Sequence, residues 1–363
     1  MLLRFIRIYG VGKTLYKVQG RMRPRVVLPR PRRARTRDIG VIGCGQFAFS
    51  TIGFHLVRNL GNRFVDCFDV SEDAASSFAD FYRIERPAGD AGALIDNPQV
   101  RVVYVASNHA SHAQYAADAL RAGKTVYVEK PVAVELSQLV ALQEAAEESA
   151  APIFAGYNRP FSAAIRELRP WVDPDRPLSL SCVVHGHHLD ADHWYRDPRE
   201  GTRICGNMGH WLDLAVHLLS WGMVPKRWRI HVAWSDDSDR DENLTVSLVS
   251  RRGDLVSITM TSRTEPFEGI YESIDLQWGD VIGRIDDFRE MTLRRGSERM
   301  HRRYRPKDVG HDTALMQPFG ESSRDWSEVI LSTHLMLAIK DMVEGSDRVR
   351  DFDFGASGVP LVS

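Results

Sequence analysis

The sequence predicts an α/β protein with two domains, a doubly wound parallel sheet followed by an α/β domain with an open, mostly antiparallel sheet. Between Asp38 and Ala155, short apolar runs alternate with segments of helical spacing, as in proteins with a parallel sheet. Beyond Ala155, expected strands follow one another with few helices between them. The length of 363 residues and the 43% of hydrophobic residues suit two packed cores. We expect the domains at 38–155 and 156–363.

The first domain has a clear order of elements. Glycine-terminated or β-branched apolar runs predict strands at 38–43, 64–70, 100–106 and 125–128. Helices are expected at 47–60, 71–81 and 112–122, two of which end at a glycine. In the second domain, alternation predicts strands at 178–187, 229–234, 244–250, 255–261 and 273–277. Two helices are expected there, at 208–221 and 326–343.

Residues 1–37 differ from the rest in charge. They carry 12 Lys and Arg and no acidic residue, whereas the remainder has 35 basic and 48 acidic residues. With Pro24, Pro29 and Pro31, the segment predicts a basic, flexible arm that folds over its own acidic body. Peripheral docking of the arm on an anionic membrane or on a protein is the alternative. Arg4 and Arg7 interrupt the apolar start, which is atypical of a secretory signal.

Composition excludes several classes of protein. No run of 18 apolar residues is present, so no transmembrane helix is expected. The acidic body argues against nucleic acid as a partner. The four cysteines are widely spaced without a C-x-x-C pair, so we expect neither a disulfide framework nor a zinc site, and we expect a cytoplasmic location.

The first chemical motif is Gly43-Cys-Gly45-Gln46-Phe47-Ala48, between an expected strand and an expected helix. Glycines there allow a tight turn and close approach of a pyrophosphate, and the helix N-terminus favours the anion. A plain strand–turn–helix joint is the alternative. However, Asp69 ends the next strand, 24 residues after Gly45, where an acid would bind the ribose hydroxyls of a dinucleotide. Its charge would repel a 2′-phosphate, so the motif predicts a Rossmann domain that binds NAD rather than NADP.

The second motif is Glu129-Lys130-Pro131, directly after the expected fourth strand. A lysine at the carboxyl end of a parallel strand faces the crevice in which ligands bind. Its ammonium could hold a substrate hydroxyl and assist removal of the proton. Taken alone, the motif is better explained by a surface Glu-Lys pair before a turn proline.

A third constellation lies on the expected helix at 208–221. His210, Asp213 and His217 form one polar stripe on an otherwise apolar helix, which is costly unless the groups find partners. We expect His217 to be structural, and a structural role is the alternative for His210. The run from His185 to His193 could suggest a metal, but strand alternation separates His185 and His187 from His188. Four arginines could form a fork for a carboxylate or diphosphate, with solvated surface arginines as the alternative: Arg159, Arg196, Arg199 and Arg203.

Together, these motifs resemble the glucose-fructose oxidoreductase/inositol dehydrogenase (Gfo/Idh/MocA) family, from about Asp38 to the C-terminus. The resemblance includes the glycine motif, Asp69 and Glu129-Lys130-Pro131. It continues in Val105-Ala-Ser-Asn-His109 with His112, Gly156-Tyr-Asn-Arg159-Pro-Phe161, Asp192-His-Trp194 and His210-Trp-Leu-Asp213. The basic arm has no counterpart in the usual family pattern.

The resemblance implies a role for each matching position. Lys130 and His210 would be catalytic, no metal would be needed, and the peptide before Pro131 could be cis. Cofactor contacts would come from Gly43, Gly45, Gln46, Phe47, Ala48, Asp69, Ser107, Asn108, His109, His112, Glu129 and Lys130. Substrate contacts would come from Tyr157, Asn158, Arg159, His193, Trp194, Asn207 and Asp213. The second domain would also form the interface of a homo-oligomer. The chain departs from the family at Gly206, where many members have an aspartate.

These observations lead to a functional expectation. The chain is expected to be an NAD-dependent oxidoreductase that transfers a hydride to or from a secondary alcohol carbon of a small sugar-like substrate. A nucleotide sugar in glycan biosynthesis is the preferred substrate, on the strength of the four arginines. A free polyol or inositol dehydrogenase is the first alternative. A non-catalytic NAD-binding subunit is the second, because Gly206 replaces the family aspartate.

Overall fold

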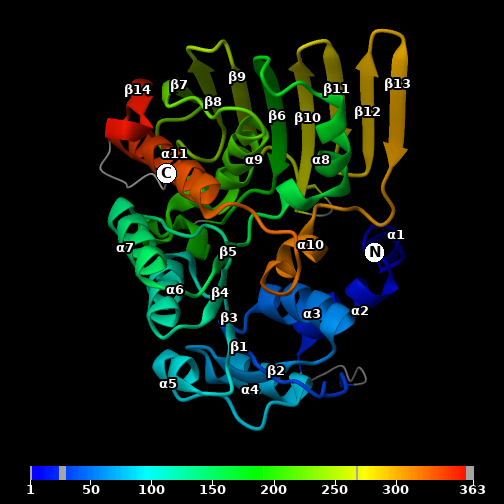
Figure 1. Cartoon of the computed structure of the whole chain (residues 1–363), viewed down its shortest axis with the longest axis vertical. Coiled ribbons are helices and arrows are strands. Elements are labelled where there is room, and N and C mark those ends of the chain that lie inside the picture. Colours follow the sequence, from blue (N-terminus) through cyan, green and yellow to red (C-terminus); the bar gives the residue numbers. More distant parts are fainter. Residues whose placement is uncertain (1, 24–29, 191, 267–268, 357–363) are drawn as a thin grey trace. The chain divides into compact units, whose positions relative to one another are not determined.

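The computed structural model describes residues 2–23, 30–190, 192–266 and 269–356. The chain forms two compact units, each assembled from separate stretches of sequence (Figure 1). The first unit comprises Met1–Ala133, Ser137–Gly156 and His311–Trp326. The second comprises Val134–Leu136, Tyr157–Gly310 and Ser327–Ser363.

The first unit is built on a five-stranded parallel sheet. Its strands lie in the order β2 (Phe64–Phe68), β1 (Ile39–Ile42), β3 (Val102–Val105), β4 (Thr125–Val128) and β5 (Ile153–Ala155). All four residues of β1 and of β3 are buried, as expected for a sheet covered by helices on both faces. The predicted doubly wound parallel sheet is confirmed.

Helices connect these strands. They are α3 (Gly53–Leu60), α4 (Glu72–Tyr82), α5 (Ala91–Asp96), α6 (His112–Arg121) and α7 (Leu136–Glu148). The side chain of Ser71 caps α4 by accepting a hydrogen bond from the N–H of Ala74 at 3.3 Å. A π-helical turn, η1 (Ala48–Ile52), precedes α3, so the expected helix at 47–60 is not α-helical throughout.

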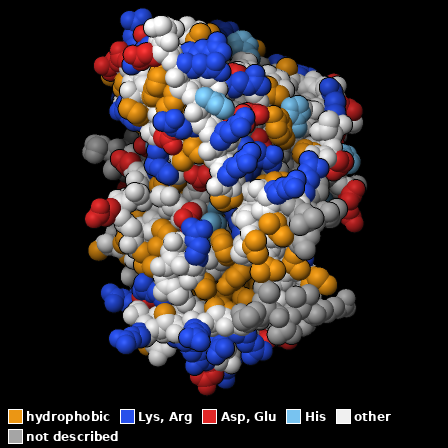
Figure 2. Space-filling model, turned by 90° about the vertical axis from the view of Figure 1, so that its right-hand side faces the viewer, with side chains coloured by type: hydrophobic (Ala, Val, Ile, Leu, Met, Phe, Trp, Pro, Cys, Tyr) orange, Lys and Arg blue, Asp and Glu red, His pale blue; other side chains and the backbone are white. Residues whose placement is uncertain are grey.

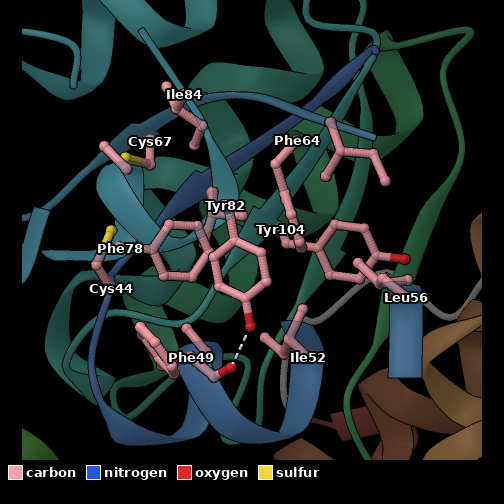
Figure 3. Close-up of a cluster of buried hydrophobic side chains, with 14 of the residues drawn as sticks. Cys44, Phe49, Ile52, Leu56, Phe64, Cys67, Phe78, Tyr82, Ile84 and Tyr104 are labelled. Carbon is pink, nitrogen blue, oxygen red and sulfur yellow. Dashed lines mark hydrogen bonds between the residues drawn. The ribbon is translucent and has the colours of Figure 1, made fainter. Parts of the chain in front are cut away.

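An aromatic cluster fills the core between η1, α3 and α4 (Figure 3). The ring of Tyr82 packs against Phe49, Phe64 and Phe78 at centroid distances of 5.5, 4.8 and 4.5 Å. Its hydroxyl donates to the carbonyl oxygen of Phe49. A Cβ atom at Gly53 would lie 1.8 Å from that hydroxyl oxygen, so the close packing of Tyr82 requires glycine there.

The N-terminal segment differs from the expected flexible arm. Residues 2–22 form two helices, α1 (Leu2–Tyr9) and α2 (Val11–Met22), and α2 contacts η1 and α3. The ring of Tyr16 packs edge-on against Phe54 and Phe81, at centroid distances of 5.3 and 5.7 Å. The apolar residues between the basic ones therefore form one face of a helix. The charge and proline content of the segment favoured a flexible arm and did not indicate this face. Pro24 and Pro29 lie outside the described residues, and Pro31 lies within them.

The second unit contains a nine-stranded sheet. The order is β13 (Glu298–Arg303), β12 (Glu290–Arg295), β11 (Val281–Asp286), β10 (Ile270–Trp278), β6 (Leu178–Gly186), β9 (Leu255–Thr261), β8 (Leu244–Ser250), β7 (Arg227–Trp234) and β14 (Val349–Asp353). Of these pairings, β6 with β9 is parallel and the others are antiparallel. The predicted open, mostly antiparallel sheet is therefore confirmed.

The helices of the second unit are α8 (Ala163–Leu168), α9 (Gly209–Ser220) and α11 (Trp326–Gly345). A π-helical turn, η7 (Ile204–Met208), leads directly into α9.

At the edge of the sheet, β13 carries exposed Arg299, Arg302 and Arg303. Lys and Arg side chains are abundant on the face drawn in Figure 2. Charged side chains on an edge strand discourage pairing with another sheet.

One stretch belongs to a different unit from the one expected. Residues 311–326, including α10 (His311–Leu315), cluster with the first unit although they were assigned to the second domain. The hydroxyl of Tyr104 in β3 donates to the carbonyl oxygen of Leu315 at 2.6 Å, and α10 contacts α3.

Among the described residues, no helix combines the length and apolar character needed to cross a membrane.

Candidate active site

The glycine-rich turn after β1 has the shape that a pyrophosphate requires. Gly43 has a φ of 92°, and a Cβ atom there would lie 2.4 Å from the carbonyl carbon of Ala106. Glycine is thus needed for both the backbone angle and the close approach of the loop after β3. A Cβ atom at Gly45, in contrast, would meet nothing within 4 Å. The turn therefore leaves open space beside its backbone N–H groups, immediately before the first helical turn at Ala48.

Asp69 is fixed at the end of β2, next to this turn. One carboxylate oxygen accepts a hydrogen bond from the N–H of Cys44 at 2.6 Å, and the other accepts from the N–H of Ser71 at 2.8 Å. The side chain is half-buried at the end of β2, beside the turn. The residues present fit the adenosine half of NAD, because the acid that would bind ribose lies beside the turn that would bind phosphate.

The loops after β3 and β4 are linked by His112. Its Nδ1 lies 2.8 Å from the carbonyl oxygen of Pro131, and its Nε2 lies 3.1 Å from that of Ser107. The peptide bond between Lys130 and Pro131 is cis, as the family resemblance implies. Within the loop after β3, Asn108 is exposed and His109 is buried. The structure thus brings the cofactor residues predicted on these two loops together.

Glu129 and Lys130 have different environments although they are neighbours in sequence. Burial raises the pKa of the Glu129 carboxyl to about 7, while the charge of Lys130 acts in the opposite direction. The carboxylate accepts from the Tyr127 hydroxyl at 3.4 Å and from the N–H of Lys130 at 3.3 Å. Lys130 itself is half-buried. Glu129 is therefore enclosed in the protein interior, whereas the lysine retains contact with solvent.

In the second unit, His210 occupies the first turn of α9. Its ring lies 6.1 Å from that of Tyr157 and 5.9 Å from that of Trp211, nearly perpendicular to the former. His210 and Asn207, which lies in η7, are half-buried. Gly206, where many family members have an aspartate, is buried. The predicted substrate residues Tyr157 and Asn158 are buried as well. Asn158 donates to the carbonyl oxygen of Val309 at 2.5 Å.

The other members of the polar stripe on α9 contact α11. Asp213 is fully buried and accepts from the hydroxyl of Ser332 at 2.9 Å. His217 lies 2.9 Å from a carboxylate oxygen of Glu328 and accepts from the indole N–H of Trp221 at 3.3 Å. These contacts agree with the structural role expected for His217. For Asp213 they provide a packing function, and its contact with substrate stays a prediction.

The four arginines expected to form an anion-binding fork are engaged with internal carboxylates, and two of them, Arg196 and Arg203, share Glu242. Each is paired with a carboxylate of the same unit, at N–O distances between 2.6 and 2.7 Å: Arg159 with Glu272, Arg196 with Asp239, Arg199 with Asp197, and Arg203 with Glu242. Arg159 is in addition buried, with its guanidinium carbon 4.4 Å from the centre of the Trp211 ring. Nε and Nη2 of Arg159 donate to the two carboxylate oxygens of Glu272, so this fork of the guanidinium is already used. The contact of Arg159 with substrate stays a prediction.

The histidine-rich stretch also acts within the fold. His187 Nδ1 lies 3.2 Å from the carbonyl oxygen of Gly269, and His188 Nδ1 lies 3.0 Å from Glu242. In the parts of the chain that the structure describes, no group of three or more His, Cys, Asp or Glu could hold a metal ion. His193 accepts from the N–H of Tyr195 at 3.2 Å, and 46% of the surface of Trp194 is exposed. Trp194 thus remains available as a contact surface.

The carboxylates that hold these arginines were not predicted from the sequence. Buried and more exposed residues alternate along β10. Glu272 lies on the buried face of this strand, together with Ile274 and Leu276. An acid on the apolar face of a strand signals a buried cationic partner, because an unpaired charge there would be costly. That signal was present in the sequence, but it does not identify which arginine is the partner.

Comparison with known proteins agrees with this geometry. Residues 37–157 match the family described as "Oxidoreductase family, NAD-binding Rossmann fold" (GFO_IDH_MocA). Inositol 2-dehydrogenase 2 of Saccharopolyspora erythraea is 30% identical over 190 residues, which are 52% of this chain and 56% of that protein. Inositol 2-dehydrogenase of Ralstonia nicotianae is 30% identical over 192 residues, 51% of this chain and 52% of the relative. The chain thus spans about half the length of these curated relatives.

Solved structures show the same fold over most of the chain. Levoglucosan dehydrogenase, in complex with NADH and levoglucosan, matches with a TM-score of 0.72 at 16% identity, covering 90% of this chain and 100% of that one. A structure described as a putative myo-inositol dehydrogenase from Sinorhizobium meliloti matches with a TM-score of 0.68 at 16% identity, covering 88% and 100%. Residues 37–157 thus match the NAD-binding Rossmann domain of the Gfo/Idh/MocA oxidoreductase family, and the fold agrees with these structures over most of the chain.

Proposed function

We propose that the protein is an NAD-dependent dehydrogenase that interconverts a secondary alcohol and the matching ketone on a free polyol or sugar. The observation that carries this proposal is the pairing of an intact dinucleotide turn after β1 with a half-buried lysine just after strand β4 of the same sheet. Relatives named inositol 2-dehydrogenase support the substrate class. NAD, when bound, would accept the hydride from the alcohol carbon.

The residues have distinct roles in this proposal. The Lys130 ammonium donates a hydrogen bond to the substrate hydroxyl oxygen and stabilises the negative charge that develops there as the proton leaves. His210 accepts that proton in the oxidative direction and returns it in the reductive one. Asp69 binds the ribose of the cofactor, and the exposed Trp194 offers an apolar surface to a sugar ring.

A free polyol replaces the nucleotide sugar as the preferred substrate. The nucleotide sugar was expected because arginines could bind its diphosphate, and those arginines are engaged with internal carboxylates. Arg199 and its partner are the most exposed of the four pairs, and they lie in one short segment. A diphosphate would have to displace a carboxylate from each arginine, which removes most of the gain in binding energy.

A panel of substrates tests the proposal. NADH formation is followed at 340 nm with myo-inositol, free hexoses and matched nucleotide sugars. We expect at least about tenfold higher kcat/KM, or about 1.4 kcal/mol, for a free polyol or sugar. A nucleotide sugar that outperforms every free sugar would contradict the substrate class.

The second candidate is a non-catalytic NAD-binding subunit, which the buried Gly206 at the family's aspartate position favours. Without that carboxylate, the proton relay from His210 lacks its usual ionisable partner. This candidate predicts tight binding of NAD but no NADH formation across the whole panel. Turnover with any one substrate excludes it.

A further inference from the structure

The C-terminal end of helix α2 lies against the dinucleotide turn. Arg23 follows the last residue of α2, and its Nη2 donates to the carbonyl oxygen of Cys44, inside the Gly43–Gln46 turn. Its Nη1 donates to the carbonyl oxygen of Ala74 at 3.0 Å and to the hydroxyl of Ser77 at 2.7 Å, both in α4. One side chain thus connects α2, the turn and the helix that follows Asp69.

A second contact joins the same helix to the same turn. The side-chain amide of Gln46 donates to the carbonyl oxygen of Lys17 at 3.2 Å. The guanidinium carbon of Arg23 also lies 4.7 Å from the centre of the Phe49 ring, in the π-helical turn that follows the glycines. The N-terminal helices therefore form part of the wall around the turn, although they precede the family pattern, which begins at about Asp38.

The contact also has an electrostatic consequence. Cys44 accepts from the Arg23 guanidinium through its carbonyl and donates to the Asp69 carboxylate through its N–H, at 2.6 Å. The cation and the acid that binds ribose are thus attached to the same residue. Burial lowers the pKa of Arg23, while the charges of neighbouring groups including Asp69 raise it. The positive charge partly offsets the repulsion between Asp69 and a 2′-phosphate.

We propose that Arg23, supplied by the N-terminal helices, is a specificity-determining residue of the cofactor site that moderates the preference of Asp69 for NAD over NADP. The inference rests on the proposed binding of NAD at this turn, but it does not require turnover. Arg23 acts through Asp69 and the turn, so it is a positioning residue with an electrostatic effect rather than a catalytic one. The cation comes from a segment remote in sequence, because the residue after Asp69 is valine.

The test compares the binding of NAD and NADP to the full chain by titration calorimetry. Arg23→Ala is expected to weaken NADP binding by at least about fivefold more than NAD binding, since only NADP carries the 2′-phosphate. Arg23→Lys retains the charge and is expected to keep the NADP/NAD affinity ratio within about twofold of wild type. Arg21→Ala is the matched control, because Arg21 is exposed in the last turn of the same helix.

The outcomes separate the possible roles of Arg23. Equal weakening of both nucleotides by Arg23→Ala would show that the residue only supports the fold, and it would overturn the inference. An unchanged ratio in Arg23→Gln, which retains polar contacts without charge, would overturn it too, and this variant serves if Arg23→Ala fails to fold. Wild-type protein that binds neither nucleotide would instead refute the proposed function. Binding of both nucleotides without an Arg23 effect refutes only the inference.

Discussion

The guanidinium of Arg159 donates to both carboxylate oxygens of Glu272, at 2.7 and 3.0 Å, in the interior of the second unit. The indole N–H of Trp211 donates to the same carboxylate at 2.8 Å. Trp211 is the neighbour of His210 in α9, so the ion pair fixes the helix turn that carries the proposed proton acceptor. Arg159, which the resemblance assigns to substrate, thus supports the helix turn that carries His210 through Glu272 and Trp211.

The first prediction concerns this pair. Arg159→Ala leaves the Glu272 carboxylate buried without its cation, so the free energy of unfolding should fall by about 3–5 kcal/mol. Urea denaturation measures the change. Arg199→Ala is the control, because its ion pair with Asp197 is exposed and screened by solvent, so the free energy of unfolding should stay nearly unchanged. Unchanged stability together with a raised KM would instead place Arg159 in contact with substrate.

The fold was predictable where the sequence pattern is periodic. The apolar runs of β1, β3 and β4 and the helix that Ser71 caps follow directly from spacing and capping rules. β13 was missed because its sequence, Glu298–Arg303, is almost entirely polar and exposed, so it shows no alternation. α2 was missed for a related reason, since charge and proline content obscured the apolar face that includes Tyr16.

The site was predictable to the extent that it depends on backbone geometry. Gly43, Asp69 and the Lys130–Pro131 peptide lie at strand ends, where local sequence determines their position. The pairing of Arg159 with Glu272 could not be predicted, because it joins residues 113 positions apart through tertiary packing. The contact of Arg23 with Cys44 has the same character, since it depends on how α2 packs.

The second prediction concerns Lys130. Lys130→Met should leave the affinity for NAD within about twofold of wild type but lower kcat by about 10²–10⁴-fold, because the developing charge on the substrate oxygen loses its donor. His210→Ala should also lower kcat, as Lys130→Met does. Stopped-flow measurement of NADH formation, with NAD affinity measured in parallel, checks both variants. Near-normal turnover in Lys130→Met would show that the lysine is structural.

The third prediction concerns cofactor choice. NAD should bind at least about tenfold more tightly than NADP, about 1.4 kcal/mol, because the Asp69 carboxylate repels a 2′-phosphate. Asp69→Ser should reduce this preference to less than about threefold by removing the charge. Titration calorimetry with both nucleotides measures the ratio. Equal affinities in the wild-type protein would show that Asp69 does not contact the ribose.

The last prediction concerns the pH dependence of stability. The pKa of Glu129 is raised from 4.5 to about 7 by burial, so the folded state favours the protonated carboxyl. Its stabilising contribution is therefore fully present below pH 4.5 and is lost as the pH rises through about 7. Glu129→Gln stays neutral at every pH, so it should gain roughly 3 kcal/mol relative to wild type between pH 4.5 and pH 8.

Urea denaturation of both proteins at several pH values in this range measures the difference. Glu85→Gln is the matched control, because Glu85 is exposed and its replacement should leave the wild-type profile unchanged. The gain should build up between pH 4.5 and pH 7, the interval between the ordinary and the raised pKa of the carboxyl, and level off above pH 7. Parallel stability profiles for wild type and Glu129→Gln would mean that Glu129 titrates normally. The carboxyl would then be charged beside Lys130 over most of the pH range measured.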